Sequence, residues 1–408
     1  MPKELRKNLT NSQPSQQGFL LAFGEMFLKS DGVFKILKRN LANHLIFFLK
    51  KEKCDFKLRQ YRERFFIESP APESRSRVIS PKTGLGKFTK VLQNTFGLAW
   101  FAQTFFLPKA GLKELSRFIK NNYSKWIGEN QTFALRVKKS GEIKESREKI
   151  IKEIAAQIKR KVNLDNPSKE IFIEGRADGW FVFFKKQAGL GGLPINSQGR
   201  VMTLVSGGID SPVAAWLTAK RGAENIWLHF HSFPLVSQKS IEKTKELAKV
   251  FINYQPKLKV WYLPFSEIQL RIKTNAPAKY RILLYRRLMF KIAEKLARKE
   301  NCQALITGES LGQVSSQTTT NLSIIEEAIK MPVLRPVIGW DKQEIISLAQ
   351  KINTYEISIK PQEDCCSLFV PKHPTASGQL KTAKELEKNL NLGKLIQKAV
   401  KEAKAEIF

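Results

Sequence analysis

The second half of the chain alternates short apolar segments with longer amphipathic ones. The apolar segments are VMTLV (201–205), NIWLHF (225–230), VWYLPF (260–265) and ALITG (304–308). Short segments with few polar residues are typical of strands that are buried on both faces, and helical stretches between them suit crossover connections. The pattern therefore predicts an α/β fold in which helices cover an open parallel sheet.

The first half of the chain predicts two α+β regions. Strands are expected at 19–23, 65–67, 98–106, 132–140, 170–176 and 179–186, and helices at 111–126 and 145–162. A Gly-rich stretch that contains Pro194 then separates the two halves. The expected organisation is a polar leader (1–17), two α+β domains (18–95 and 96–187), a Gly-rich linker (188–200) and the α/β domain (201–408).

The charge of the chain points to the kind of partner. The chain carries 70 Lys and Arg residues against 37 Asp and Glu, which gives a net charge of +33 at pH 7. Residues 1–200 hold 39 basic and 18 acidic residues, so the excess is strong in the first half. A folded surface this basic favours a polyanionic partner such as nucleic acid. Alternatively, the positive charge could reflect a general enrichment of lysine in the proteome from which the chain comes.

The predicted helix 145–162 carries the basic residues that we assign to RNA binding. They are Arg147, Lys149, Lys152, Lys159, Arg160 and Lys161. Cations of this kind contact phosphates and position a nucleic acid, and aromatic strands lie next to them in the sequence. A solvated helix face explains the same residues and is the favoured interpretation of this helix taken alone. The basic excess of residues 1–200 is what favours RNA binding.

Cysteine content and hydropathy bear on the compartment. Four cysteines are too few for a disulfide framework in a chain of this length, and a disulfide between the adjacent Cys365 and Cys366 would strain the backbone. No apolar run approaches the ~18 residues of a membrane-spanning helix, and the leader has no apolar signal core. We expect a reducing, cytoplasmic setting.

The sequence VSGGIDS (205–211) lies between a predicted strand and a predicted helix. Its small and polar residues are Ser206, Gly207, Gly208, Asp210 and Ser211. Two glycines let backbone N–H groups approach an anion, and the serines add neutral donors. We expect Ser211 to cap the helix, Gly222 to end it, and Asp210 to face a phosphate through Mg²⁺ or a ribose contact. An ordinary strand-to-helix turn is the alternative.

This loop resembles the pyrophosphate-binding loop of ATP pyrophosphatases, the PP-loop enzymes that adenylate a substrate. Further segments narrow the resemblance: FGEMFLK (23–29), AGLGGLP (188–194), HFHSFP (229–234), TGESLGQVSSQT (307–318), PVLRPVIGWDKQEII (332–346) and TYEISIKPQEDCCSLFVPKHP (354–374). Together they resemble the tRNA sulfurtransferases that make 4-thiouridine. The resemblance covers most of residues 18–375.

The resemblance implies an N-terminal ferredoxin-like domain (18–95), a THUMP RNA-binding domain (96–187) and a PP-loop ATP pyrophosphatase domain (201–408). Besides the loop residues named above, it implies ATP contacts by Leu204, Val205, His229, Phe230, Arg286, Gly308 and Gln317. Asp341 and Glu344 have the spacing of a helix-capping box, so we assign Asp341 and Lys342 structural roles. Two features depart from the family: residues 50–90 are longer and more basic than usual, and the chain ends near 408, where some members continue into a rhodanese domain.

The family's sulfur-carrying cysteine corresponds to the segment EDCCSLF (363–369). The register favours Cys365, with Cys366 as a substitute or a resolving partner, and Asp210 completes the predicted catalytic residues. On the local sequence alone, buried core cysteines are an equal alternative. A metal site would need more thiolates, and only the distant Cys54 and Cys302 remain to supply them.

The implied activity is that of an ATP-dependent tRNA sulfurtransferase. ATP, with Mg²⁺, would adenylate uridine 8 of tRNA, and persulfide sulfur would then replace O4. Expected partners are tRNA, a cysteine desulfurase as persulfide donor, and a second copy of the chain, whereas a link to thiamine biosynthesis is left open. Two alternatives remain: an amide-forming PP-loop synthetase, which would need an ammonia source, and a tRNA-binding module without catalysis.

Overall fold

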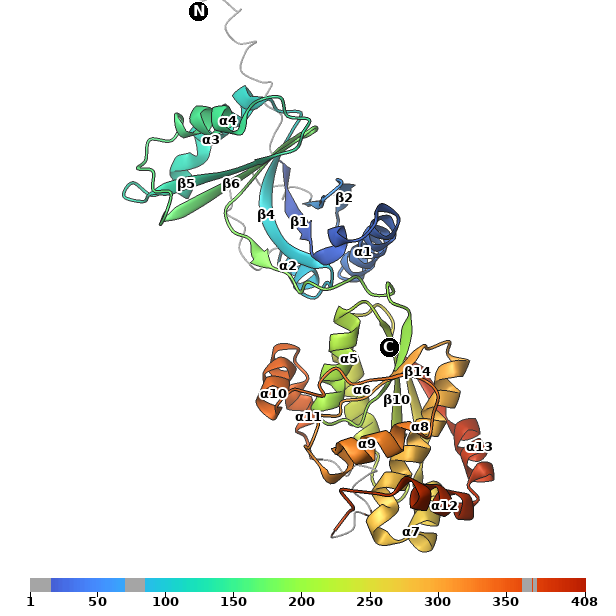
Figure 1. Cartoon of the computed structure of the whole chain (residues 1–408). Coiled ribbons are helices and arrows are strands. Elements are labelled where there is room, and N and C mark those ends of the chain that lie inside the picture. Colours follow the sequence, from blue (N-terminus) through green and yellow to red (C-terminus); the bar gives the residue numbers. More distant parts are fainter. Residues whose placement is uncertain (1–15, 70–84, 362–368, 370–372) are drawn as a thin grey trace, which may run out of the picture. The chain divides into compact units, whose positions relative to one another are not determined.

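The structure of the chain is a computed structural model that describes residues 16–69, 85–361, 369 and 373–408 (Figure 1). Residues 1–15 of the predicted leader and both cysteines of the segment 363–369 lie outside the described residues. The predicted end of the leader at residue 17 is wrong, because β1 already begins at Gln16. The chain forms two compact units. Gly192–Phe408 together with Lys35–His44 make one unit, and the rest of the chain up to Gly191 makes the other.

The first unit is built on one eight-stranded sheet. Its main path runs β2 (Lys57–Gln60), β3 (Arg64–Ser69), β1 (Gln16–Phe23), β4 (Leu98–Pro108), β7 (Gly179–Phe183), β6 (Lys169–Arg176) and β5 (Phe133–Lys139), and β8 (Gln187–Ala188) pairs with β4. Only β5 and β6 are parallel to each other among these pairs. Because β4 pairs with both β1 and β7, the two predicted α+β regions contribute to one sheet. A division into domains at residue 95 stays a prediction.

The helices of this part of the chain are η2 (Glu25–Leu28), α1 (Asp31–Lys51), α2 (Leu85–Gln93), α3 (Leu112–Trp126) and α4 (Arg147–Ala155). Of these, α3 confirms the predicted helix 111–126, while η2, α1 and α2 were not predicted. The prediction that one helix spans 145–162 is wrong, because α4 ends at Ala155. Tight turns follow it and bury Ile158 in the core of α3, α4, β5 and β6. Lys159, Arg160 and Lys161 therefore lie in a loop.

The second unit contains the predicted parallel sheet. Its order is β13 (Val333–Leu334), β12 (Ala304–Ile306), β9 (Arg200–Leu204), β10 (Glu224–His231), β11 (Lys259–Pro264) and β14 (Lys404–Ile407). The first five strands are parallel, and β14 adds an antiparallel edge that the sequence pattern did not predict. The four strands predicted from apolar segments, β9 to β12, are confirmed within one or two residues at most ends.

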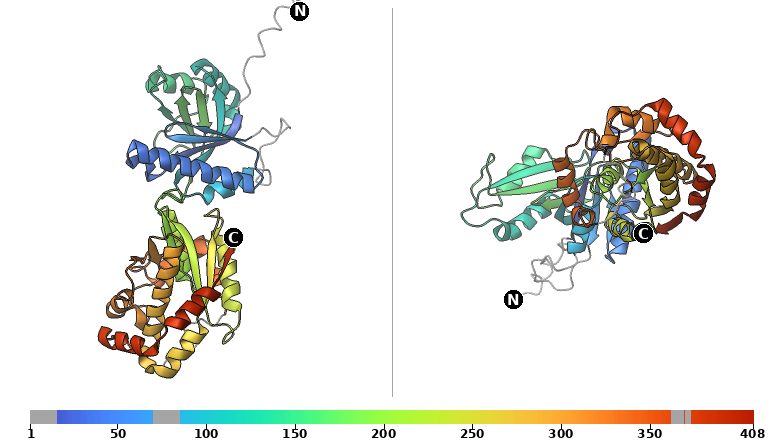
Figure 2. Two further views of the ribbon diagram at one scale, coloured as in Figure 1. Left: turned by 90° about the vertical axis from the view of Figure 1, so that its right-hand side faces the viewer. Right: turned by 90° about the horizontal axis from the view of Figure 1, so that it is seen from below.

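Helices cover both faces of this sheet (Figures 1 and 2). They are α5 (Asp210–Lys220), α6 (Lys239–Phe251), α7 (Ser266–Asn275), α8 (Arg281–Lys299), α9 (Thr319–Glu326), α10 (Lys342–Lys351), α11 (Tyr355–Ser358), α12 (Leu380–Leu390) and α13 (Gly393–Glu402), with single turns η3 (Ala278–Tyr280) and η4 (Ser315–Gln317). Helices α5 and α6 pack against β9 and β10, while α8 packs against β9 and β12. In the described part of the chain, no helix combines the length and apolar character needed to cross a bilayer.

The strand order creates a crevice at the carboxyl ends of β9 and β12. From β9 the chain proceeds through β10 to β11 on one side, and then crosses to β12 on the other side of β9. The loops after β9 and β12 therefore leave the sheet in opposite directions. In open α/β sheets, ligands bind outside the carboxyl ends of the strands at such a reversal of strand order.

Candidate functional site

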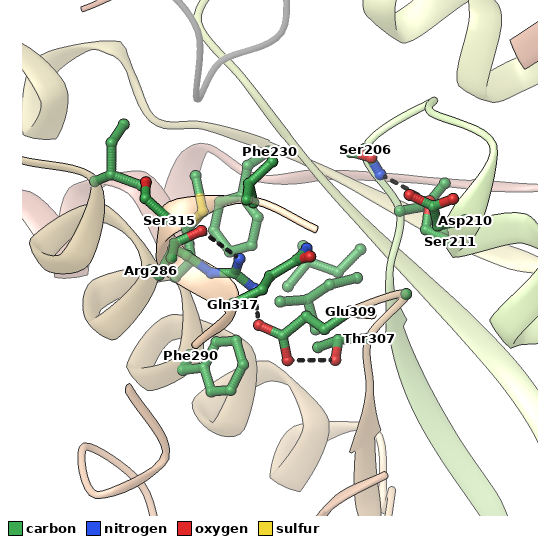
Figure 3. Close-up of a pocket in the computed structure, with 18 of the residues that line it drawn as sticks. Ser206, Asp210, Ser211, Phe230, Arg286, Phe290, Thr307, Glu309, Ser315 and Gln317 are labelled. Atoms are coloured by element: carbon green, nitrogen blue, oxygen red, sulfur yellow. Dashed lines mark hydrogen bonds and ion pairs between the residues drawn. The ribbon is translucent and has the colours of Figure 1, made fainter. Parts of the chain in front are cut away.

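A cavity of about 650 Å³ opens at this reversal (Figure 3). Most of the residues that we predicted to bind ATP line it: Leu204, Val205, Ser206, Asp210, Ser211, Phe230, Arg286, Gly308 and Gln317. Gly207, Gly208 and His229 do not line it. The structure thus brings together residues that are more than a hundred positions apart in the sequence, and their role in binding a nucleotide stays a prediction.

The glycine loop leads from β9 into the first turn of α5. Gly207 has φ +86°, a backbone conformation that favours glycine. Gly208 leaves open space, since an added Cβ would meet only the Ser206 hydroxyl, at 3.5 Å. Helix α5 begins at Asp210, so our prediction that Ser211 caps it is wrong. Instead, the Ser211 hydroxyl accepts a hydrogen bond from the Ser206 N–H at 3.3 Å and thereby braces the turn.

The end of β12 approaches this loop so closely that only glycine fits. A Cβ on Gly308 would lie 2.6 Å from the Ser211 nitrogen and 2.8 Å from its Cα. Real Cβ atoms do not come this near to a backbone, so a side chain at 308 would displace either β12 or the start of α5. Gly308 therefore shapes the cavity by letting its two walls meet.

Asp210 receives donors from two other segments. Lys342 Nζ lies 2.5 Å from Asp210 Oδ1, and Gln313 Nε2 donates to Oδ2 at 3.1 Å. The predicted capping box is confirmed, since Asp341 accepts from the Glu344 N–H and Glu344 accepts from the Asp341 N–H, both at 2.9 Å. The assignment of Lys342 to a purely structural role was incomplete, because its ammonium reaches the edge of the cavity.

A buried carboxylate that the sequence did not indicate joins two arginines. The Glu309 side chain is only 3% exposed and forms an ion pair with Arg286 through one oxygen. Its second oxygen accepts from Arg335 Nε at 2.7 Å and from the Thr307 hydroxyl at 2.8 Å. Arg286 also donates to the Ser316 hydroxyl at 3.3 Å. The position of Glu309 directly after the strand-ending glycine could have identified it.

The opposite wall of the cavity is apolar, with one polar group that lacks a partner. Side chains of Leu228, Phe230, Met289 and Phe290 line it. Gln317 projects among them from η4, and its Oε1 is buried without a hydrogen-bond partner among the residues that the structure describes. An acceptor of this kind can receive an N–H from a ligand base.

His229 lies on the other side of the strand from the cavity. Successive side chains of a strand point to opposite faces, so Phe230 enters the cavity and His229 points toward α6. Its Nδ1 donates to the Val205 carbonyl at 2.8 Å, and its Nε2 accepts from the Ser240 hydroxyl at 3.2 Å. Burial lowers the pKa of His229 to about 4. The neutral imidazole therefore anchors the strand end that leads into the glycine loop.

The predicted RNA-binding residues lie in the first unit. Arg147, Lys149, Lys152, Lys159 and Lys161 are exposed. Arg160 is half-buried, since its guanidinium lies 5.4 Å from the centre of the Tyr123 ring and donates to the Gly128 carbonyl at 3.0 Å. Arg160 therefore has a structural role as well, whereas the other side chains are available to phosphates.

The described residues contain no group of three or more His, Cys, Asp or Glu side chains that could hold a metal ion. Cys302 is buried, and desolvation raises the pKa of its thiol to about 12. It therefore stays a thiol at neutral pH and suits neither a thiolate ligand nor a nucleophile. Cys365 and Cys366 lie outside the described residues.

Two protein-family models match the chain. The THUMP domain matches residues 112–185, and the family described as thiamine biosynthesis protein (ThiI) matches residues 196–392. Among curated relatives, a probable tRNA sulfurtransferase of Moorella thermoacetica is 45% identical over 237 residues, which are 58% of this chain and 61% of the relative. Another, of Thermus thermophilus, is 47% identical over 241 residues, 59% of each chain. The matched region thus spans about three fifths of these relatives.

Solved structures resemble the chain over a greater length. A crystal structure of a 4-thiouridine synthetase–RNA complex with bound ATP is 30% identical, has a TM-score of 0.84 and covers 96% of this chain and 100% of that chain. PH1313 from Pyrococcus horikoshii Ot3 is 19% identical with a TM-score of 0.58, and this likeness shows the fold alone.

Proposed function

The chain belongs to the 4-thiouridine synthetase family, and we propose that it is an ATP-dependent tRNA sulfurtransferase. The observation that carries the proposal is the cavity at the strand reversal, which the glycine loop, the start of α5 and Arg286 line, while Lys342 pairs with the lining residue Asp210. ATP is the substrate that this combination suits best.

The residues present fit a nucleotide triphosphate. Gly208 leaves room for a phosphate beside the loop, and backbone N–H groups at the start of α5 favour an anion. Lys342 and Arg286 supply positive charge, while the apolar wall suits a base, whose amino group can donate to Gln317 Oε1. We propose that the triphosphate lies along the loop and the adenine lies against the apolar wall.

Adenylation is the first step of the proposed reaction. O4 of the uridine attacks the α-phosphorus of ATP, pyrophosphate leaves, and the uridine oxygen becomes part of a good leaving group. The cations beside the loop stabilise the charge that accumulates on the phosphates, and the fixed N–H dipoles need no reorganisation during the step. Uridine 8 of tRNA is the target that family membership suggests.

Mg²⁺ is a further part of the proposal. A bound Mg²⁺ would neutralise phosphate charge. Asp210 is the carboxylate at the loop, and magnesium is commonly held by one or two carboxylates together with substrate phosphates. Both oxygens of Asp210 already accept from Lys342 and Gln313, so Asp210 fits such an ion only if these donors turn toward the phosphates.

Sulfur transfer is the second step. We propose that Cys365 carries a persulfide whose outer sulfur attacks C4 of the uridine and expels AMP. A second thiol, for which Cys366 is the nearest choice, then cleaves the new sulfur–sulfur bond and leaves sulfur on the base. The resulting disulfide joins adjacent residues and is strained, so a cellular thiol reduces it readily and restores both cysteines. A cysteine desulfurase is the proposed sulfur donor, and the need for free thiols places the reaction in a reducing compartment such as the cytoplasm.

RNA binding is assigned to the exposed cations of the first unit, and the THUMP match at residues 112–185 supports this. Arg147, Lys149 and Lys152 lie on α4, and Lys159 and Lys161 follow in the adjacent loop. Contacts between these cations and phosphates would release counterions, so affinity for tRNA should fall steeply with salt. Pairing with a second copy of the chain stays a prediction.

The test follows both half-reactions in the full chain. ATP–pyrophosphate exchange is measured with and without tRNA, and 4-thiouridine is quantified after adding a cysteine desulfurase and cysteine. The proposal predicts exchange and thiouridine in the wild type, and exchange without thiouridine in Cys365→Ser, with a milder loss in Cys366→Ser. An exchange that needs ammonia instead of tRNA would identify an amide-forming synthetase, and tRNA binding without exchange would identify a binding module. Wild-type thiolation by the double serine variant would contradict the assignment of the cysteines.

A further inference from the structure

Glu309 is a buried carboxylate that lines the cavity, and the proposed reaction assigns it no role. It follows Gly308 after β12 and contacts Arg286 of α8 and Thr307 (Figure 3). It also contacts Arg335, which lies beyond β13. We infer that Glu309 is a positioning residue, which holds the Arg286 guanidinium toward the nucleotide and so sets the affinity for ATP. This inference rests on the proposed function.

The ion pairs of Arg335 hold the Glu309 carboxylate in a fixed position. Arg335 donates to Glu309 at 2.7 Å and to Glu326 of α9 at 2.7 Å, and its side chain is only 13% exposed. Two carboxylates therefore fix Arg335, and Arg335 in turn fixes the Glu309 carboxylate. Arginine has a long side chain with many rotamers, but an ion pair with a fixed carboxylate leaves Arg286 few of them.

The contacts also indicate that Glu309 acts through Arg286 and does not bind the nucleotide itself. Its oxygens already accept from Arg286, Arg335 and Thr307. A carboxylate is negatively charged and only accepts hydrogen bonds, so it would repel a nearby phosphate. Arg286, by contrast, is 17% exposed and lines the cavity, so its unused N–H groups can reach a ligand.

Loss of the carboxylate would release Arg286 and leave two guanidinium groups without the anion between them. Glu309→Gln keeps the shape of the side chain and removes its charge. Arg286 should then move away from Arg335 and bind ATP from a wider range of orientations. A ligand that must first order this side chain binds more weakly, without any change in the loop that holds the phosphates.

The experiment measures the ATP dissociation constant of the full chain by calorimetry. Glu309→Gln should weaken ATP binding at least tenfold, whereas the matched control Glu326→Gln should stay within twofold. Glu326→Gln removes the same charge from the same Arg335, but its side chain is 44% exposed and outside the cavity. In steady-state exchange, KM for ATP should rise in Glu309→Gln while kcat changes less than threefold.

A double-mutant cycle separates positioning from other roles. In an Arg286→Gln background, Glu309→Gln should change the dissociation constant less than twofold, because its effect acts through Arg286. An equal effect in both backgrounds would overturn the inference, since Glu309 would then bind the nucleotide or support the fold independently. Unchanged ATP binding in Glu309→Gln would overturn it as well.

Two further outcomes are a Glu309→Gln variant that does not fold and a wild-type chain that does not bind ATP. If Glu309→Gln does not fold, the double variant Glu309→Gln, Arg335→Gln removes a buried cation together with the anion and avoids an unbalanced buried charge. It should fold and bind ATP at least tenfold more weakly than the wild type, and wild-type affinity would contradict the inference. A wild-type chain that binds no ATP would overturn the proposed function, and this inference with it.

Discussion

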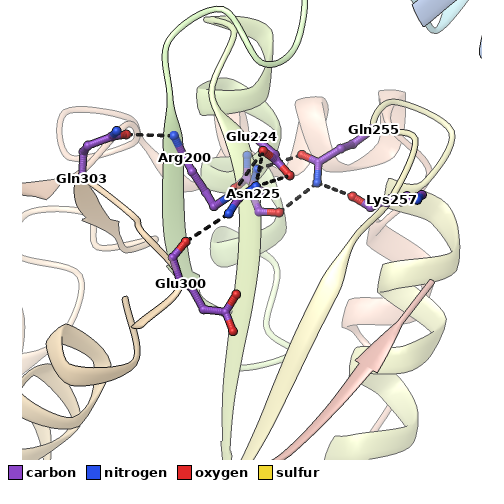
Figure 4. Close-up of polar contacts among 7 residues, drawn as sticks. All are labelled: Arg200, Glu224, Asn225, Gln255, Lys257, Glu300 and Gln303. Atoms are coloured by element: carbon purple, nitrogen blue, oxygen red, sulfur yellow. Dashed lines mark hydrogen bonds and ion pairs between the residues drawn. The ribbon is translucent and has the colours of Figure 1, made fainter. Parts of the chain in front are cut away.

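The two ends of the parallel sheet in the second unit use polar residues in opposite ways. At the amino end, the side chains bind one another and the strand backbones (Figure 4). Arg200 pairs with Glu224 at 3.1 Å, and Gln303 accepts from the Arg200 N–H at 2.9 Å. Gln255 accepts from the Asn225 N–H at 2.8 Å and donates to two backbone carbonyls. These bonds tie together the starts of β9, β10 and β12.

At the carboxyl end, polar groups surround a space and point into it. Gln317 has no partner for its Oε1 within the described chain, and Arg286 presents part of its guanidinium to the cavity. Unpaired buried acceptors cost free energy, which a fold tolerates where a ligand satisfies them. The comparison indicates that polar residues at the amino end stabilise the sheet, whereas polar residues at the carboxyl end lower its stability and are available to bind a ligand.

Substitution of Asp210 should have the largest effect on ATP–pyrophosphate exchange and should distinguish the roles of the two ends most clearly. Asp210→Ala should lower ATP–pyrophosphate exchange at least a hundredfold while tRNA binding is retained. The melting temperature should change by only a few degrees, because the partner Lys342 is 42% exposed and such ion pairs contribute little. The control Glu224→Gln removes a carboxylate at the amino end and should lower stability by about 1 kcal/mol with exchange intact. Equal loss of exchange and tRNA binding in Asp210→Ala would indicate a misfolded loop instead.

Gly308→Ala should have the next largest effect on exchange. The added methyl would meet the Ser211 backbone at 2.6–2.8 Å, so the start of α5 must shift away from β12. Because misplacement of a binding group by about 1 Å can cost a hundredfold in rate, we expect exchange to fall between ten- and a hundredfold. Circular dichroism should still show a folded chain. Wild-type exchange in this variant would mean that the loop after β12 does not help to form the binding site.

The stability of the carboxyl end of the sheet should also depend on pH. Burial lowers the pKa values of His229 and His231 to about 4, from an ordinary value of 6.5. Unfolding returns these pKa values to about 6.5, so between pH 4 and 6.5 the unfolded chain binds more protons than the folded chain. The free energy of unfolding that the neutral histidines contribute is therefore fully present above pH 6.5, and it falls as the pH drops toward 4. His229→Asn can keep the donor to Val205 and should reduce the loss by about 3 kcal/mol at pH 4. Urea unfolding at several pH values measures this, and an unchanged pH profile in His229→Asn would contradict it.

Strands of the parallel sheet could be predicted from sequence because their apolar segments are short and separated by polar helices. The edge strand β14 could not, since its residues KAEI continue the composition of α13 and acquire strand geometry only by pairing with β11. The end of α4 was missed for a similar reason. Its charged pattern continues to Lys161, but the burial of Ile158 requires the chain to turn.

The glycine loop and the residues directly after strands were predictable because motif and strand position coincide. The position of Glu309 directly after Gly308 could have marked it as a candidate. The roles of Glu309 and Lys342, however, depend on partners from other elements that meet only in the folded unit. Phe230 lines the cavity whereas His229 does not, because successive side chains of a strand point to opposite faces. A contact between His229 and the nucleotide stays a prediction.

The most direct test makes the same substitution at both ends of the sheet. Gln255→Leu should lower the free energy of unfolding by about 2 to 4 kcal/mol, because it leaves the buried N–H and carbonyl of Asn225 without this partner and also removes the bond to the Lys257 carbonyl. Its ATP dissociation constant should stay within twofold of the wild type. Gln317→Leu should keep stability within about 1 kcal/mol, since no described partner is lost, and should weaken ATP binding about tenfold. A stable Gln317→Leu variant with wild-type ATP affinity, or a Gln255→Leu variant that folds normally but binds ATP weakly, would contradict the division between the two ends.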